Sequence, residues 1–313
     1  MKAPFPWFGG KSRAADLIWD RFGNVPNYVE PFAGSLAVLL ARPHVGSVET
    51  VNDLDCYLAN FWRAVAVEPV AVAEWASWPV NEADILARHE WLLSRDEFRQ
   101  QMRTDAHFYD AKIAGWWVWG LCSWIGSGWC VQSAQQLPHL GNNGMGIHKA
   151  KLPHLGNNGR GDALAAWFSA LSARLSRVRV ACGEWDRVLG DSVTTKHGVT
   201  AVLLDPPYDE GGHSVAYAAG GNVSDAVRRW AIDNGENDLL RIALCGYEGE
   251  HDMPSSWESV AWKAQGGYGS QSNGRGRDNA KRERIWFSPA CLSMTLPFDD
   301  LSPRCQQNLD EVS

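Results

Sequence analysis

Short apolar runs alternate along the chain with segments of helical periodicity, and this alternation restricts the fold more than any other feature. Two parallel neighbouring strands need a long crossover between them, and the crossover is usually a helix. Strands that alternate with helices are therefore typical of an α/β fold with a largely parallel sheet. The predicted strands are residues 49–52, 178–182, 199–204, 241–245 and 284–287.

A helical segment interrupts this alternation between residues 58 and 163. It contains several predicted helices followed by a polar, glycine-rich loop, and we interpret it as an inserted domain. The remaining residues, 1–57 and 164–295, are predicted to form the α/β domain, and the acidic residues 296–313 a flexible tail. The predicted helices of the insert are residues 58–67, 82–93, 95–102 and 109–124.

The glycine-rich loop contains a short tandem duplication. The sequence Leu-Pro-His-Leu-Gly-Asn-Asn-Gly occurs at residues 137–144 and again at residues 152–159. Two copies are too few for a repeat architecture. A tolerated duplication in a surface loop is the simpler interpretation. A flexible arm that carries histidine, asparagine and basic side chains to a polyanion is the alternative.

Charge and cysteine content exclude several classes of protein. The net charge of −7 excludes a uniformly basic nucleic-acid coat, but it leaves room for a local basic face. The seven cysteines form no Cys-x-x-Cys pair, so we interpret them as reduced core thiols of a cytoplasmic protein and expect no metal site. Residues 113–131 lack charges, but their four glycines favour a buried helix and loop over a membrane span.

The strongest chemical signal is the sequence Val-Leu-Leu-Asp-Pro-Pro-Tyr at residues 202–208. An apolar strand ends at Asp205, and the prolines after it stiffen the backbone because proline cannot continue a sheet ladder. The Asp205 carboxylate and the Pro206 carbonyl are thereby presented as two acceptors, with the ring of Tyr208 beside them. Such a pair suits the planar exocyclic amine of adenine or cytosine. An ordinary turn with an incidental aspartate is the alternative.

A second signal is the sequence Tyr-Val-Glu-Pro-Phe-Ala-Gly-Ser at residues 28–35. A short strand leads to Glu30, a turn with Gly34 follows, and a helix is predicted at residues 36–40. This order is typical of the first strand–helix turn of nucleotide-binding folds, although the G-x-G-x-x-G pattern is absent. Asp53 ends the next predicted strand, where an acidic group can accept hydrogen bonds from ribose hydroxyls.

Together with the sequence Pro-Trp-Phe-Gly-Gly-Lys at residues 6–11, these motifs resemble those of the Dam-like, α-group DNA N6-adenine methyltransferases, and phage-borne members in particular. The resemblance covers residues 1–60 and about 175–290. It implies a doubly wound, seven-stranded, Rossmann-like methyltransferase sheet with an inserted, mainly helical target-recognition domain. It also implies a site-specific enzyme that transfers a methyl group from S-adenosylmethionine to N6 of a flipped adenine. The implied partner is double-stranded DNA in the cytoplasm, with no membrane and no obligate protein partner.

The resemblance implies roles for single residues, motif by motif. Asp205, Pro206, Pro207 and Tyr208 correspond to the catalytic tetrapeptide. Its acidic and carbonyl oxygens accept hydrogen bonds from the amine, and its aromatic ring stacks on the flipped base. The implied cofactor-binding residues are Trp7, Lys11, Glu30, Phe32, Ala33, Gly34, Ser35, Asp53, Trp185 and Asp205.

Two departures from the family pattern stand out. Leu36 occupies the place where the cofactor loop usually has a second glycine. Residues 116–119, Trp-Trp-Val-Trp, occur where many relatives have polar and basic residues, and we expect these tryptophans, with Trp124, to build the core of the insert.

The sequence leaves other activities open. An N4-cytosine or an RNA adenine methyltransferase would keep the same fold, although an aspartate before Pro-Pro-Tyr favours adenine. A catalytically silent DNA-binding relative is the alternative from another class, and the intact Asp205 motif and Lys11 argue against it. The lack of a Pro-Cys nucleophile element argues against C5-cytosine chemistry.

Positive charge for DNA is concentrated in two stretches, residues 145–180 and 263–287. The second stretch contains a glycine-rich basic loop, residues 266–277, which suits contacts with phosphates. An ordinary exposed connection is the alternative for this loop. The predicted DNA-binding residues are Lys149, Lys151, Arg160, Arg275, Arg277 and Lys281.

Overall fold

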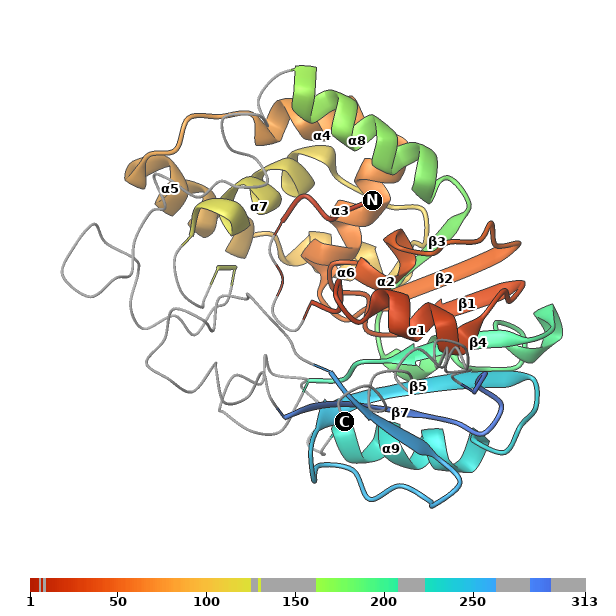
Figure 1. Ribbon diagram of the computed structural model, residues 1–313. Helices are drawn as coiled ribbons and strands as arrows, with labels where there is room; N and C mark the ends of the chain where they lie inside the picture. Colours follow the sequence, from red (N-terminus) through yellow and green to blue (C-terminus); the bar gives the residue numbers. More distant parts are fainter. Residues whose placement is uncertain are drawn as a thin grey trace, which may run out of the picture.

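The computed structural model describes residues 1–5, 7, 10–124, 129–130, 162–207, 223–262 and 282–293. Within these residues, one seven-stranded sheet has the order β3-β2-β1-β4-β5-β7-β6 (Figure 1). The strands are β1 (Asn27–Glu30), β2 (Val48–Asp53), β3 (Val178–Cys182), β4 (Thr200–Leu204), β5 (Leu240–Tyr247), β6 (Glu258–Ala261) and β7 (Glu283–Phe287).

The sheet is parallel from β3 to β5, and β7 runs antiparallel between β5 and β6. β1 lies between β2 and β4, with Asn27 opposite Val48 on one side and Thr200 on the other. The strand order therefore reverses between β1 and β4, which is the topological switch point of a doubly wound sheet. The predicted largely parallel, doubly wound sheet is confirmed.

Helices cover both faces of this sheet. Successive side chains of a strand point to opposite faces, so neighbouring residues of one strand pack against different helices. On β4, Leu203 belongs to the larger of two hydrophobic clusters, together with α1 (Ala15–Phe22) and α2 (Ala37–Leu40). Its neighbour Leu204 belongs to the second cluster, together with α9 (Val223–Asn234). Because β4 is buried on both faces, nearly all of its side chains are apolar.

A layer of helices extends the larger cluster away from the sheet (Figure 1). These helices are α3 (Cys56–Val67), α4 (Pro69–Ala76), α5 (Glu82–Leu93), α6 (Asp96–Thr104), α7 (Ala111–Ser123) and α8 (Asp162–Leu175). α3 contacts β2 and β3 on one side and α7 and α8 on the other. The predicted tryptophan core is confirmed for Trp117, Trp119 and Trp124, which are buried, whereas Trp116 is half-buried. The limits of a separate recognition domain at residues 58–163 stay a prediction.

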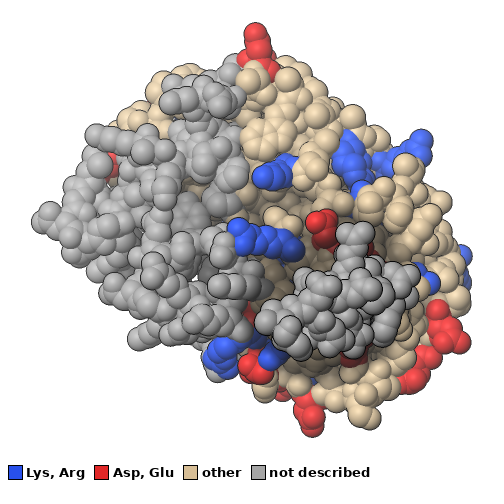
Figure 2. Space-filling view, in the orientation of Figure 1, with Lys and Arg blue, Asp and Glu red and all other residues tan. Residues whose placement is uncertain are grey.

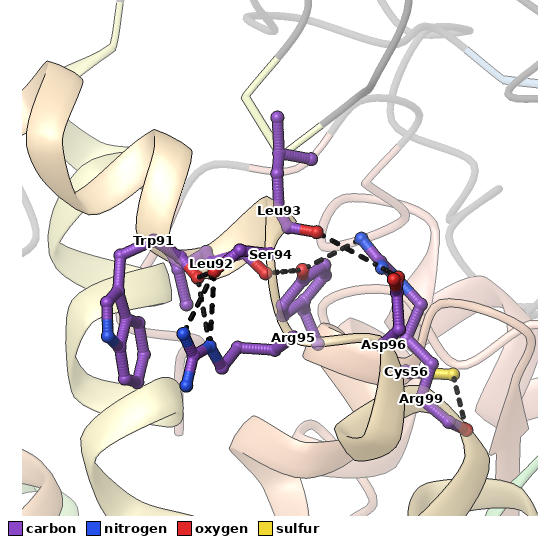
Figure 3. Close-up of polar contacts among 9 residues, drawn as sticks. Cys56, Trp91, Leu92, Leu93, Ser94, Arg95, Asp96 and Arg99 are labelled. Atoms are coloured by element: carbon purple, nitrogen blue, oxygen red, sulfur yellow. Dashed lines mark hydrogen bonds and ion pairs between the residues drawn. The ribbon is translucent and has the colours of Figure 1, made fainter.

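A polar corner joins α5 and α6 to the start of α3 (Figure 3). Arg99 of α6 donates from Nη1 to the carbonyl of Leu93 at 3.5 Å and to Asp96 Oδ1 at 3.1 Å. Its Nη2 donates to the Tyr57 hydroxyl at 3.0 Å, and that hydroxyl donates to the carbonyl of Leu92 at 2.6 Å. This network fixes the outer helices to the helix that contacts the sheet.

Several elements were not predicted, namely α1, α4, α8, α9 and β6. β6 is an edge strand whose residues are mostly exposed, so its sequence shows no apolar alternation. α7 has 13 residues and ends before Trp124, which is extended. Among the described residues, no helix is long and apolar enough to cross a membrane.

The six described cysteines are free thiols, and all except Cys130 are buried, as predicted for core thiols. The duplication at residues 137–144 and 152–159 and the tail at residues 296–313 lie outside the described residues.

Candidate active site

Three acidic side chains meet at one edge of the sheet. β1 ends at Glu30, β2 ends at Asp53, and Asp205 directly follows β4. Since β1 lies between β2 and β4, all three carboxyl groups belong to the switch point, and the charges of Asp205 and Asp53 both act on Glu30. Ligands of doubly wound sheets bind at this carboxyl edge. The structure therefore brings together the three acids that the sequence predicted for cofactor binding and catalysis.

The loop after β1 contains two residues with left-handed backbone. Gly34 has a φ of +48°, and a Cβ added there would lie 2.7 Å from Nε1 of Trp7, so the indole packs directly on the loop backbone. Leu36 has a φ of +53°, and its side chain is fully buried. Because glycine adopts this conformation without a steric penalty, the backbone at position 36 gives a physical reason for the glycine that the resemblance expects there.

Asp53 shapes this loop through hydrogen bonds. Its Oδ2 accepts from the Gly34 N–H at 3.1 Å, and its Oδ1 accepts from the Asp55 N–H at 2.9 Å. Burial, with the nearby charge of Asp55, raises the pKa of Asp53 to about 7. A carboxylate can accept about four hydrogen bonds, so a ribose hydroxyl remains compatible with this geometry.

Asn52 joins the loop after β1 to the segment after β3. Its Nδ2 donates to the carbonyl of Pro31 at 3.1 Å and to that of Gly183 at 2.9 Å. On the two sides of this bridge, the rings of Phe32 and Trp185 form a near-parallel pair, with centroids 6.2 Å apart and an interplanar angle of 19°. Two of the predicted cofactor-binding aromatics are thus neighbours beside the carboxyl edge.

Glu30 is a buried acid at the end of the central strand. Its Oε2 accepts a hydrogen bond from the Tyr28 hydroxyl at 3.0 Å. Burial raises the pKa of Glu30 well above its usual range, and the charge of Asp205 adds to this, although the Tyr28 hydrogen bond acts in the opposite direction. A buried titratable group with a strongly perturbed pKa is typical of functional sites.

Lys11 occupies the centre of the charged cluster. Its Nζ lies 2.8 Å from Asp205 Oδ1 and 4.0 Å from Glu283 Oε2, and its side chain is 4% exposed. The ring of Trp262 lies 5.5 Å from the same Nζ. Burial alone would lower the pKa of Lys11, but the charges of Asp205 and Glu283 outweigh burial and raise it above the usual value. The cluster therefore holds a charged ammonium against the predicted catalytic carboxylate.

This arrangement agrees with the comparison to known families. Residues 7–114, about a third of the chain, match the family model of the D12 class N6 adenine-specific DNA methyltransferases. Over these residues, the chain is similar to this enzyme family. Among curated proteins, none matches the chain significantly. This match confirms the predicted resemblance to Dam-like adenine methyltransferases, a group that methylates N6 of adenine in DNA.

The matched part of the chain includes most of the N-terminal motif, the loop after β1 and Asp53. The catalytic tetrapeptide lies outside the match, and the structure places three of its residues. Asp205 is partly exposed, Pro206 is buried and Pro207 is exposed, whereas Tyr208 is outside the described residues. Ala33 and Ser35, also predicted to bind cofactor, are buried in the loop.

The predicted DNA-binding residues all lie outside the described residues, namely Lys149, Lys151, Arg160, Arg275, Arg277 and Lys281. Figure 2 shows separate groups of basic side chains, with acidic ones among them, on the described part of one face. One arginine of the first basic stretch has a structural role, because Arg174 Nη1 pairs with the buried Glu49 at 2.6 Å.

Glu283 and Trp262 were not predicted as site residues. Strand periodicity offered a signal for Glu283, because positions 283, 285 and 287 share one face of β7, and Ile285 and Phe287 are buried. A carboxylate on such a face needs a charged or hydrogen-bonding partner. The identity of that partner, Lys11, could not be read from the sequence because the antiparallel return of β7 brings them together.

Proposed function

We propose that the chain transfers a methyl group from S-adenosylmethionine to the N6 amino group of an adenine flipped out of double-stranded DNA, at specific sites. The observation that carries this proposal is the contact between Lys11 Nζ and Asp205 Oδ1, 2.8 Å long, at the switch point of the sheet. It places a carboxylate with a fixed cationic partner directly before a Pro-Pro sequence.

The proposed chemistry follows from the acceptors at the end of β4. The exocyclic amine of a purine is a poor nucleophile because its lone pair is delocalised into the ring. Hydrogen bonds from the amine to Asp205 and to the Pro206 carbonyl favour a tetrahedral nitrogen and the positive charge that develops on it. The Lys11 ammonium contacts Asp205 Oδ1, and the carboxylate keeps further lone pairs that can accept a hydrogen bond from the amine.

The residues at the carboxyl edge fit the proposed cofactor. The loop around Gly34 would hold the amino-acid part, Asp53 the ribose hydroxyls, and the ring of Trp185 the adenine. Support for this assignment comes from the perturbed pKa of the buried Asp53 and from the aromatic pair of Trp185 and Phe32. When bound, S-adenosylmethionine supplies an electrophilic methyl group on a sulfonium. The carboxyl groups around Lys11 complement the positive charge of that sulfonium.

Base flipping and phosphate contacts are part of the proposal. An adenine inside a duplex is inaccessible to a buried carboxylate, so the base must leave the stack, and we assign its stacking partner as Tyr208. The basic stretches with Lys149, Lys151 and Arg160, and with Arg275, Arg277 and Lys281, are assigned to the DNA backbone because both concentrate positive charge in an acidic protein.

Identification of the modified base tests this function. The protein is incubated with S-adenosylmethionine labelled in the methyl group and, in separate reactions, with methyl-free duplex DNA or unmodified RNA, which is then digested to nucleosides. We expect labelled N6-methyl-2′-deoxyadenosine from the DNA, and sequencing of the methylated positions then defines the target site. Labelled N4-methyl-2′-deoxycytidine, label in RNA alone, or no transfer would each support one of the alternative activities instead.

A matched pair of variants tests the role of Asp205. Asp205→Asn is expected to lower the methylation rate by at least about 10²-fold, because it removes the charge that stabilises the transition state. Binding of S-adenosylmethionine should persist in equilibrium dialysis. Asp238→Asn, which changes an exposed aspartate in the same way, should retain the wild-type rate. An Asp205→Asn enzyme with full activity would contradict the mechanism.

A further inference from the structure

Among the described residues, the cluster around Lys11 contains its ammonium and the carboxylates of Asp205 and Glu283. We infer that Glu283 is a positioning residue, which holds the Lys11 ammonium against Asp205. This inference rests on the proposed function, and it concerns a residue on β7, outside the matched family segment and outside every motif of the sequence.

Glu283 is fixed more firmly than a loop residue would be. It is the first residue of β7, it lies opposite Tyr247 of β5, and it is 5% exposed. Its carbonyl accepts a hydrogen bond from the Trp262 N–H at 3.2 Å, which joins β7 to the end of β6. Groups held on strands keep their geometry better than groups on loops, so Glu283 can define the position of a flexible lysine.

Lys11 is therefore held from three directions. Asp205 follows β4, Glu283 begins β7, and the ring of Trp262, after β6, lies 5.5 Å from Nζ. The lysine stem has four rotatable bonds, and its ammonium can donate three hydrogen bonds in different directions. The second carboxylate and the aromatic face restrict the ammonium to the side of the cluster where it contacts Asp205 Oδ1.

The charge of Glu283 attracts the Lys11 ammonium. In a buried environment this attraction is larger than in water, so it helps to keep the ammonium beside Asp205. Two further groups face Lys11, Glu30 from β1 and Cys245 from β5, and burial raises the pKa of both, which favours their uncharged forms.

Glu283→Gln keeps the shape of the side chain and removes its charge. We expect the single-turnover methylation rate to fall about tenfold, an effect in the ordinary range for coupled neighbours. Binding of S-adenosylmethionine should change much less than the rate. Without Glu283 the pKa of Lys11 falls, because burial opposes its charge, so the decline of the rate at alkaline pH should begin at lower pH than in the wild type. Glu97→Gln, a change of an exposed carboxylate on α6, is the matched control and should keep the wild-type rate and pH profile.

A double-mutant cycle distinguishes positioning from a structural role. If Glu283 acts through Lys11, the variant Lys11→Met with Glu283→Gln is no slower than Lys11→Met alone. The double variant also removes one buried charge of each sign, so it stays informative if Glu283→Gln alone unfolds.

The inference is overturned if Glu283→Gln has the wild-type rate and pH profile, or if the two rate losses multiply in the double variant. A folded wild-type protein that methylates no base would instead overturn the proposed function, and the role of Glu283 with it.

Discussion

Two buried cations show how differently the sheet edge and the helical layer are built. Lys11, at the sheet edge, contacts the carboxylates of Asp205 and Glu283, and their charges raise its pKa. Arg88 of α5 lies among tryptophan rings, with its guanidinium 4.1 Å from the centroid of Trp119 and 4.9 Å from that of Trp116. Burial lowers the pKa of Arg88. Lys11 is therefore held by ion pairs with carboxylates, whereas Arg88 is held mainly by packing against aromatic rings.

The largest expected effect is on the rate, and it belongs to Lys11. Lys11→Met keeps the length of the side chain but removes the charge that holds Asp205 in place. We expect the methylation rate of the folded variant to fall by about 10²-fold or more. The free energy of unfolding should also fall, by about 3–5 kcal/mol, because the buried Glu283 carboxylate loses the Lys11 ammonium. Rate assays with labelled cofactor, together with urea unfolding, check both values. A folded Lys11→Met variant with the wild-type rate would place Lys11 in the same class as Arg88.

Arg88→Met should lower the stability of the protein and leave the methylation rate unchanged. Loss of the contacts with the indole rings is expected to destabilise the protein by about 1–2 kcal/mol, the range for desolvated cation–π contacts. The methylation rate measured well below the unfolding temperature should not change. If the variant is as stable as the wild type, the cost of burying the guanidinium cancels the gain from its aromatic contacts. Arg88 would then not stabilise the helical layer, contrary to the comparison with Lys11.

Asp53 is a further buried ionisable group at the sheet edge, and it should make the stability of the protein depend on pH. Its pKa is raised to about 7 in the folded protein, from an ordinary value near 4. Between these two pKa values, Asp53 therefore takes up a proton when the protein folds. The resulting stabilisation is complete below the pKa of Asp53 in the unfolded chain and is lost as the pH rises through about 7. Asp53→Asn should flatten this loss in urea unfolding measured between about pH 5 and pH 8. An unchanged slope would show that other groups cause the dependence, and Asp238→Asn serves as the exposed control.

The smallest expected effect concerns the backbone at Leu36. Leu36→Ala and Leu36→Gly both delete a fully buried side chain, so each should destabilise the protein by about 2–5 kcal/mol. Their difference isolates the left-handed conformation, because glycine adopts a φ of +53° without strain. We expect the glycine variant to be about 1 kcal/mol more stable than the alanine variant, the reverse of the usual order. Equal stabilities would mean that the loop relaxes when the leucine is removed.

Much of the sheet could be predicted because its strands are apolar runs. The predicted residues 178–182 are β3 itself, and β4 differs from its prediction by one residue. The acids at the ends of β1, β2 and β4 were predictable for the same reason, because an acidic residue that ends an apolar run lies at the carboxyl edge. The family resemblance supplied the roles that local patterns alone left open.

The remaining features depend on contacts between distant parts of the chain. Trp7 was predicted to bind the cofactor, but its ring packs on Gly34, a contact that no local pattern encodes. Glu283 and Trp262 reach Lys11 only because β6 and β7 return antiparallel beside β5. The stretch from Trp116 to Trp119 suggested core packing, but the stacking of Arg88 on these rings requires α5 to lie against α7, which helical periodicity cannot specify.

The amide of Asn52 has a consequence for the thermodynamics of ligand binding. Its hydrogen bonds to Pro31 and Gly183 join the two walls of the candidate cofactor site within the folded protein itself. The loss of conformational entropy that comes with ordering these walls therefore belongs to folding, and binding does not incur it a second time. A ligand that binds against these two segments would meet a surface whose shape is already set, so its heat of binding would report contacts rather than loop ordering.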